Sequence, residues 1–282
     1  MNLNFRYSTL GVLLIVLIIS ACKTTGGLST KEALLRFQPT KGDQYKMGMQ
    51  MSMMMEGPQA MTMTMTMDND LKVNGVDKDG SFYLDNILKK IGMSMNNPMM
   101  NMNYDSSNPN MDDPTSAEMH KTMGAMIDKS MVSKLSNRGE LLEAPNYDEI
   151  FGDNPEMAGQ IDQMNQSLES TFITYPENAV KVGDSWDATS EIAGQVPMTQ
   201  NFTYTVKEIT ATNVILSVNG TIDLSPEAMM SGKGDFNGEM TINRLDGMVQ
   251  LSTMKQNLNM SVMGMDMKTS TDINLTMTKQ GK

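Results

Sequence analysis

Hydrophobic and polar residues alternate along two neighbouring stretches near the start of the chain. Every odd position from Met47 to Met55 is a methionine, and so is every odd position from Met61 to Met67. A period of two places successive side chains on opposite faces of a β-strand. The short connector at residues 56–60 predicts a hairpin that pairs Met55 with Met61. All of these methionines are therefore expected on one apolar face, with the intervening polar residues facing water.

The same alternation, broken by turn signals, continues through most of the chain. Asp79-Gly80 and Asp246-Gly247 are typical of hairpin turns. At residues 262–264 the apolar side chains shift from one set of alternate positions to the other, which predicts a bulge. Residues 93–114 are rich in Met, Asn, Pro and Ser and are expected to form an irregular excursion. The further predicted strands cover residues 71–76, 81–91, 132–136, 140–143, 172–175, 186–192, 198–209, 214–224, 234–245, 248–258 and 260–277.

Two segments show helical rather than strand periodicity. Residues 115–118 have the form of a capping box, and apolar residues at helical spacing follow, which predicts a helix near 116–130. Pro155 begins a second apolar stripe that predicts a helix near 155–169. No charged or Gly/Ser-rich linker divides the chain after residue 30, so residues 31–282 are expected to form one domain. The predicted class is α+β, mainly antiparallel β: a curved, incompletely closed sheet, or half-barrel, with two covering amphipathic helices.

The first 21 residues have the pattern of a targeting signal. Arg6 precedes an apolar run from Leu10 to Ile19, which is too short to span a bilayer as a mature helix. Residues 19–22 (Ile-Ser-Ala-Cys) resemble the lipobox of bacterial lipoproteins, which implies cleavage before Cys22 and attachment of acyl chains to its thiol. Residues 22–30 would then be a lipidated flexible tether. Because Lys23 follows the cysteine, the resemblance implies the outer membrane, with the protein facing the periplasm.

Two glycine-aspartate motifs carry a wider resemblance. Residues 41–45 (Lys-Gly-Asp-Gln-Tyr) and residues 176–186, which end in Val-Gly-Asp-Ser-Trp, resemble a family of uncharacterised lipoproteins of unknown function. Its members are similar in outline to half-barrel carriers and lipid-binding lipoproteins of cell envelopes. The resemblance implies a fold and lends no catalytic residue.

Composition excludes several kinds of site. A formal net charge of -11 argues against nucleic-acid binding, which requires basic patches. The chain has one cysteine and one histidine, His120, so a disulfide framework, a Cys/His zinc site and a Cys-His dyad are excluded. Nucleophile-elbow, phosphate-loop and dinucleotide motifs are absent from the sequence. We therefore expect a protein that is not an enzyme and has no catalytic residues, metal or cofactor.

The 34 methionines are the main clue to function, and several interpretations stay open. They fit a packed core, because the unbranched thioether fills irregular space. They also fit a groove for a lipid, an acyl chain or another hydrophobic small molecule, if the sheet does not close, or simply a structural surface on the envelope. Odd-numbered position in the predicted strands is the one criterion by which we assign residues to the lining of such a groove. The residues assigned are Met49, Met51, Met63, Met65, Met265 and Met267.

Two further hypotheses use the sulfur atoms chemically. Thioethers favour Cu(I), and the methionines of the predicted excursion lie outside regular strands that would bury them. His120 and Met123, one helical turn apart, would add an imidazole–thioether pair of ligands. Exposed methionines could also act as a sink for oxidants, since they form sulfoxides. The candidate copper ligands in the excursion are Met93, Met95, Met99, Met100 and Met102.

Overall fold

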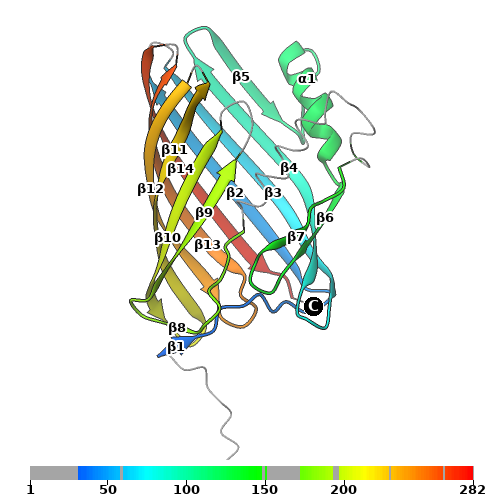
Figure 1. The fold of residues 1–282 in the computed structure, drawn as a ribbon. Helices are drawn as coiled ribbons and strands as arrows, with labels where there is room; N and C mark the ends of the chain where they lie inside the picture. The colour runs from blue at the N-terminus through cyan, green and yellow to red at the C-terminus, as the bar shows by residue number, and fades with distance from the viewer. Residues whose placement is uncertain are drawn as a thin grey trace, which may run out of the picture.

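A computed structural model describes residues 31–57, 60–147, 150, 172–192, 197–228, 230–262 and 264–281. Figure 1 shows one large antiparallel sheet, with strand order β7-β6-β4-β3-β2-β14-β13-β12-β11-β10-β9, in which β5 also pairs with β4. A separate two-stranded sheet joins β1 to β8. The strands are β1 (Glu32–Ala33), β2 (Gln44–Glu56), β3 (Met61–Val76), β4 (Phe82–Asn97), β5 (Met100–Asp105), β6 (Ser130–Leu135), β7 (Leu141–Glu143), β8 (Val180–Lys181), β9 (Ser185–Ile192), β10 (Met198–Ile209), β11 (Asn213–Ala228), β12 (Met230–Asn243), β13 (Val249–Val262) and β14 (Met265–Lys279).

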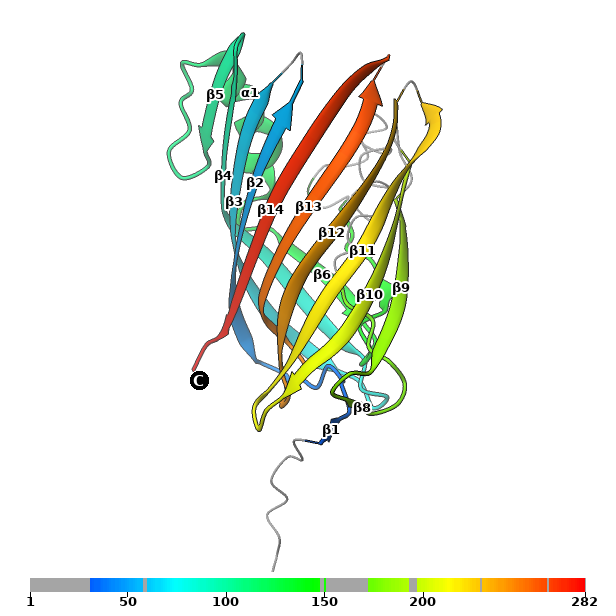
Figure 2. The same ribbon diagram turned by 90° about the vertical axis from the view of Figure 1, so that its left-hand side faces the viewer.

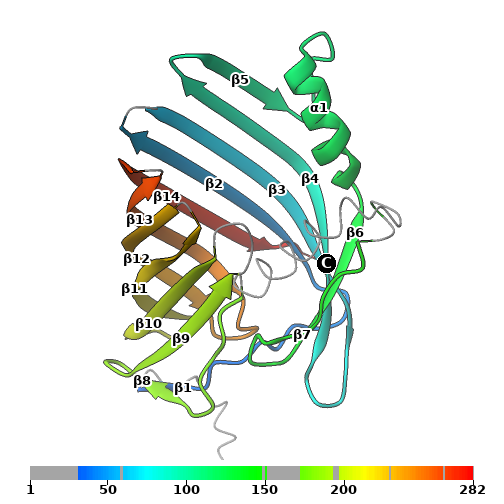
Figure 3. The same cartoon turned by 45° about the horizontal axis from the view of Figure 1, so that its top comes forward.

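The large sheet curves strongly without closing. Figures 2 and 3 show the strands bending around one concave side. Strands β7 and β9 form the two edges, as Figure 3 shows. Within the described residues no ladder joins these two edge strands, so the sheet stays open. The predicted class, mainly antiparallel β with an incompletely closed sheet, is confirmed to this extent.

The methionine hairpin forms as predicted. Met55 pairs with Met61, Met53 with Met63, and Met51 with Met65. These odd-numbered side chains point to the concave, inner face of the sheet. The opposite, outer face carries Thr62, Thr64 and Thr66 and cross-strand ion pairs such as Lys46–Asp70 and Lys255–Asp272. Period-two alternation therefore separates an apolar inner face from a hydrated outer one.

The prediction of two covering helices needs correction. The described part of the chain contains one α-helix, α1 (Pro114–Met123), followed by the 3-10 turn η1 (Gly124–Met126). The helix starts earlier than the capping box suggested, because Asp113 caps it through the backbone N–H of Thr115. The helix predicted near 155–169, the signal segment 1–21 and the tether 22–30 lie outside the described residues. Among the described helices, none is long and apolar enough to cross a membrane.

Two predictions about irregular segments are wrong. Residues 93–97 and 100–105 are not an excursion but continue β4 and form β5, because their methionines pair with methionines of neighbouring strands. The parity shift at 262–264 is not a bulge within one strand. It is the turn between β13 and β14, where Val262 pairs with Met265 and Gly264 adopts a positive φ of 79°.

One end of the half-barrel, the lower end in Figure 1, is closed by two floor segments, residues 33–38 and 172–178. The backbone N–H of Phe37 donates to Asn137, and the Tyr175 hydroxyl donates to the carbonyl of Gly247 at 2.6 Å. The rings of Phe37 and Tyr175 pack against each other in a tilted arrangement with centroids 4.8 Å apart, and Phe37 also packs on Phe82 of β4. Residues 172–175 therefore belong to the floor rather than to the predicted strand.

The two glycine-aspartate motifs form equivalent turns, each leading from a floor segment into a strand. Gly42 and Gly183 have φ values of 88° and 91°, which L side chains rarely adopt. In each turn the aspartate carboxylate accepts the backbone N–H three residues earlier, and the glycine N–H donates to a strand residue, Val73 or Val206. The two glycine-aspartate motifs of the sequence therefore form the same kind of turn at two places in the fold.

Candidate ligand-binding site

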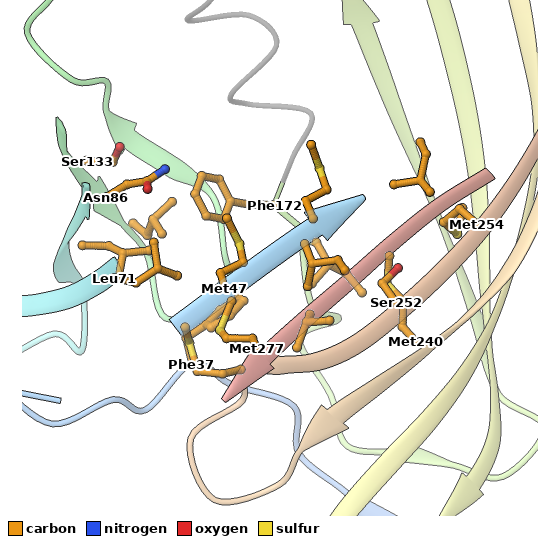
Figure 4. A pocket seen from close by; sticks show the side chains of 18 of the residues that line it. Phe37, Met47, Leu71, Asn86, Ser133, Phe172, Met240, Ser252, Met254 and Met277 are labelled. Atoms are coloured by element: carbon orange, nitrogen blue, oxygen red, sulfur yellow. The ribbon is translucent and has the colours of Figure 1, made fainter. Parts of the chain in front are cut away.

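An apolar cavity of about 380 Å³ lies inside the half-barrel, directly above the floor segments. Figure 4 shows side chains converging on it from both arms of the curved sheet and from the floor. A volume of this size lies within the range of small-ligand pockets, roughly 300–1,000 Å³. One arm contributes Met47, Met49, Leu71, Phe82, Leu84 and Leu135, the other Phe202, Phe236, Met240, Met254, Leu275 and Met277, and the floor Phe37, Phe172 and Ile173.

The lining is mainly apolar, and its polar side chains are uncharged. The described residues around the cavity include no Asp, Glu, Lys, Arg or His. Burial raises the pKa of the Tyr204 phenol to about 12, so this lining group stays neutral at ordinary pH. The polar side chains besides tyrosine are Asn86, Ser133, Gln200, Ser252 and Gln256. A guest in this cavity would exchange water for hydrocarbon on most sides and meet only neutral polar groups.

One of these polar groups is incompletely satisfied. The Oδ1 atom of Asn86 is buried and has no hydrogen-bond partner among the described residues. A second amide in the same wall, Asn69 on β3, is also buried with its Oδ1 unpartnered. The register pairs Leu71 with Asn86 and Asn69 with Leu88, so the two amides are diagonal neighbours on the inner face. Of the two, only Asn86 borders the cavity.

Of the six methionines nominated from parity, Met49 lines the cavity. Met51, Met63 and Met65 lie further along the same inner face, beyond the described lining. Met267 pairs with Met260 on that face, and Met265 pairs with Val262 beside the turn and is 40% exposed. Cys22 lies outside the described residues. Odd-numbered strand positions therefore identified the inner face, while the cavity lies closer to the floor than the five nominated methionines other than Met49.

Sequence reasoning missed the floor and the aromatic lining. Phe37 comes from a segment for which no element was predicted, and Phe172 and Ile173 from a segment predicted as a strand. Phe202 and Phe236 face the cavity from the opposite arm. The available signal was proline: Pro39 and Pro176 follow closely after Phe37 and Tyr175 and interrupt any strand pattern there.

The methionine-rich upper part of the inner face forms a second cluster. Met119 and Met123 of α1 pack against buried Leu88, Ile91 and Tyr104. The Tyr104 hydroxyl lies 3.1 Å from Nδ1 of His120, so this histidine has a protein partner. Among the described residues, no group of three or more His, Cys, Asp or Glu side chains could hold a metal ion.

An ion cluster ties the C-terminal strand to the lower end. Lys279 Nζ lies 2.6 Å from Asp43 Oδ2 and 3.6 Å from Asp246 Oδ2, and the Tyr45 hydroxyl donates to Asp246 Oδ2 at 3.0 Å. Burial and the Asp246 charge raise the pKa of Tyr45 well above its ordinary value, so the phenol remains a neutral donor. The cluster lies away from the cavity lining and serves to fix the strand ends.

Comparison with protein families gives one match, to a family of unknown function, DUF6263, over residues 79–166 and 156–249. The chain belongs to this family. The matched residues run from the turn before β4 to the beginning of β13, so they include much of both arms and the second floor segment. A comparison of the DUF6263 chain with curated proteins finds no match.

Solved structures give a match in fold. A lipovitellin structure, described as "Lipid-protein interactions in lipovitellin", is similar over 86% of this chain with a TM-score of 0.53 and 7% sequence identity. The DUF6263 chain spans about a quarter of that protein, 26% of its length. A crystal structure of Pseudomonas aeruginosa OccK5 (OpdH) aligns with 86% of this chain and 99% of its own, with 4% identity and a TM-score of only 0.29.

Proposed function

We propose that this DUF6263 protein is a non-catalytic, lipid-anchored protein of the cell envelope that binds a lipid or acyl chain in the cavity above the floor. The uncharged apolar cavity inside an open sheet is the observation that carries the proposal. Each methylene of a chain that leaves water for this cavity contributes about 0.8 kcal/mol to binding.

The shape of the sheet supports the same proposal. Among the described residues no ladder joins β7 to β9, and we propose that a long apolar guest reaches the inner face from this side without unfolding the sheet. Above the cavity the inner face continues as methionines, whose flexible thioethers adapt to guests of different shape. The lipovitellin structure, which is described by its lipid–protein interactions, is similar in fold.

The anchor is part of the proposal. Cys22, at the end of the signal-like segment, would carry the acyl chains, and residues 22–30 would let the half-barrel stand off the membrane. With Lys23 after the cysteine, we propose the outer membrane as the location, with the protein facing the periplasm. Radiolabelled palmitate incorporated by the wild-type chain and not by Cys22→Ser tests the attachment.

The test of binding is extraction of lipid from the purified full-length protein. We expect about one non-covalent lipid per chain, and substitution Leu275→Trp should remove most of it because the indole would fill the cavity. Asn274→Trp is the matched control, since the neighbouring Asn274 lies on the outer face of the same strand and is exposed. If the wild-type protein carried lipid only at background level, the proposal of lipid binding would be contradicted, and the half-barrel would be a packed structural surface.

A Cu(I) site is the second candidate function, and the register favours it. Met53 pairs with Met63, Met63 with Met95, and Met95 with Met102, so four thioethers form a row across β2, β3, β4 and β5. Cross-strand neighbours have Cβ atoms about 4.5–5.5 Å apart, close enough for thioethers to share one soft metal ion.

The copper site has its own discriminating variants. Anaerobic Cu(I) titration should show tight binding that is lost in a Met63→Leu, Met95→Leu double variant. Met99→Leu is the control, because Met99 is 86% exposed in the turn before β5 and pairs with none of the row. Weak binding that both variants leave unchanged would remove copper from consideration and leave lipid binding or an oxidant sink.

A further inference from the structure

The cavity contains one polar position that packing alone does not explain. Asn86 lines the cavity from β4, between Leu84 and Leu88 on the same face. Figure 4 shows it beside Ser133 of β6, with the amide end turned toward Phe172. Its Oδ1 atom is buried and lacks a hydrogen-bond partner among the described residues. A leucine here would fill similar space without leaving a polar atom unsatisfied.

The unsatisfied atom is a hydrogen-bond acceptor. A carbonyl oxygen buried away from water is stabilised only when a donor reaches it. The neighbouring wall offers Met131 as the register partner of Asn86 and Ser133 diagonally next to it, and no hydrogen bond joins these described groups to Oδ1. A guest with a donor group would complete the site.

Charge decides which donors fit. No acidic or basic side chain lies among the described lining residues, so an ionised head group would enter without a counter-charge. Burying an unpaired charge costs far more than burying a hydroxyl that finds a partner. An uncharged hydroxyl group satisfies both conditions, whereas a carboxylate meets neither.

We propose that the guest is a neutral lipid with a free hydroxyl group, in the class of fatty alcohols and partial acylglycerols, and that Asn86 accepts a hydrogen bond from that hydroxyl. The hydrocarbon part would lie against the methionines and phenylalanines of the two arms. This inference rests on the proposed lipid-binding function and specifies the chemistry of the ligand.

Three probes of equal chain length separate the contributions. Decanol carries a donor, methyl decanoate is neutral with acceptors only, and decanoate is ionised at about pH 8. Calorimetric titration of the full-length protein, stripped of co-purified lipid, should give decanol an affinity about five- to tenfold above that of methyl decanoate, the value of one hydrogen bond. Decanoate should bind more weakly than both.

Two variants test whether the preference for decanol depends on Asn86. Asn86→Leu should remove the advantage of decanol while methyl decanoate binds as before, and the variant should remain folded because it removes an unsatisfied polar atom. Asn96→Leu is the matched control, an exposed asparagine on the outer face of the same strand, and should keep the wild-type preference.

The outcomes are distinguishable. Equal binding of decanol and methyl decanoate, or tighter binding of decanoate, would overturn the hydroxyl inference while lipid binding stands. A decanol preference that persists in Asn86→Leu would also overturn it. Failure of all three probes to bind would instead contradict the proposed function itself.

Discussion

The two ends of the inner face are built from different side chains. At the lower end, Val73, Phe82 and Leu135 are fully or almost fully buried against the floor segments. At the upper end, Met63 and Met65 occupy the equivalent inward positions of β3 and remain only partly buried. Both ends belong to one sheet and one continuous inner face.

Because of this difference, the lower end has a fixed shape and the upper end can adapt to a guest. Branched and aromatic side chains have few rotamers and pack into a defined floor, whereas methionine has three rotatable side-chain bonds and specifies shape weakly. The floor therefore sets where the cavity lies, and the methionines above it can adjust to a guest. Substitutions at the lower end should be costly, and substitutions at the upper end should be tolerated.

The largest effect is expected from Phe82→Ala. Phe82 is fully buried, contacts the ring of Phe37 at a centroid distance of 5.9 Å, and borders the cavity. Its removal should lower the free energy of unfolding by about 3–5 kcal/mol, because the rigid floor cannot collapse into the space. Urea denaturation measures this loss. A cost below about 1 kcal/mol would show that the lower end is as adaptable as the upper end.

The next effect concerns the two equivalent turns. The Asp43 carboxylate is buried, accepts the N–H of Thr40 and lies 2.6 Å from Lys279. The Asp184 carboxylate is exposed and accepts the N–H of Lys181. Asp43→Ala should cost about 2–3 kcal/mol and Asp184→Ala about 0.5–1 kcal/mol, since only the first also removes a charge-assisted contact, that with Lys279. Thermal unfolding of both variants checks the difference, and equal losses would mean that the ion cluster adds nothing.

The sequence predicted the sheet well and the site only in part. Alternation fixes which face a side chain joins, so the pairing of Met51 with Met65 followed directly from the pattern. Position along the strand is a separate matter. The floor decides how deep the cavity lies, and the floor depends on contacts such as that of Arg36 Nη1 with the carbonyl of Pro176, 140 residues away. The alternation of residues along a strand carries no information about contacts between distant segments. Odd-numbered position therefore identified Met49 but not the other residues that line the cavity.

A small effect is expected from Met65→Leu at the upper end. Met65 pairs with Met51 and Met93 and packs against the cluster around Tyr104. The replacement conserves volume, so the loss of stability should stay below about 1.5 kcal/mol. The same urea titration used for Phe82→Ala provides the measurement. A loss comparable to that of Phe82→Ala would contradict the distinction between the two ends.

The smallest effect on stability is expected from oxidation of exposed methionines, and it tests how well the inner face is covered. Met54 is the even-numbered methionine of β2, lies on the outer face and is 53% exposed, between the partly buried Met53 and Met55. Dilute peroxide should convert Met99, Met111 and Met54 to sulfoxides first and leave buried Met248 intact. Peptide mass spectrometry follows each site, and thermal unfolding should not change at this stage. If Met53 and Met55 oxidised as fast as Met54, water would reach the inner face as freely as the outer one, and the upper end would be neither core nor ligand groove.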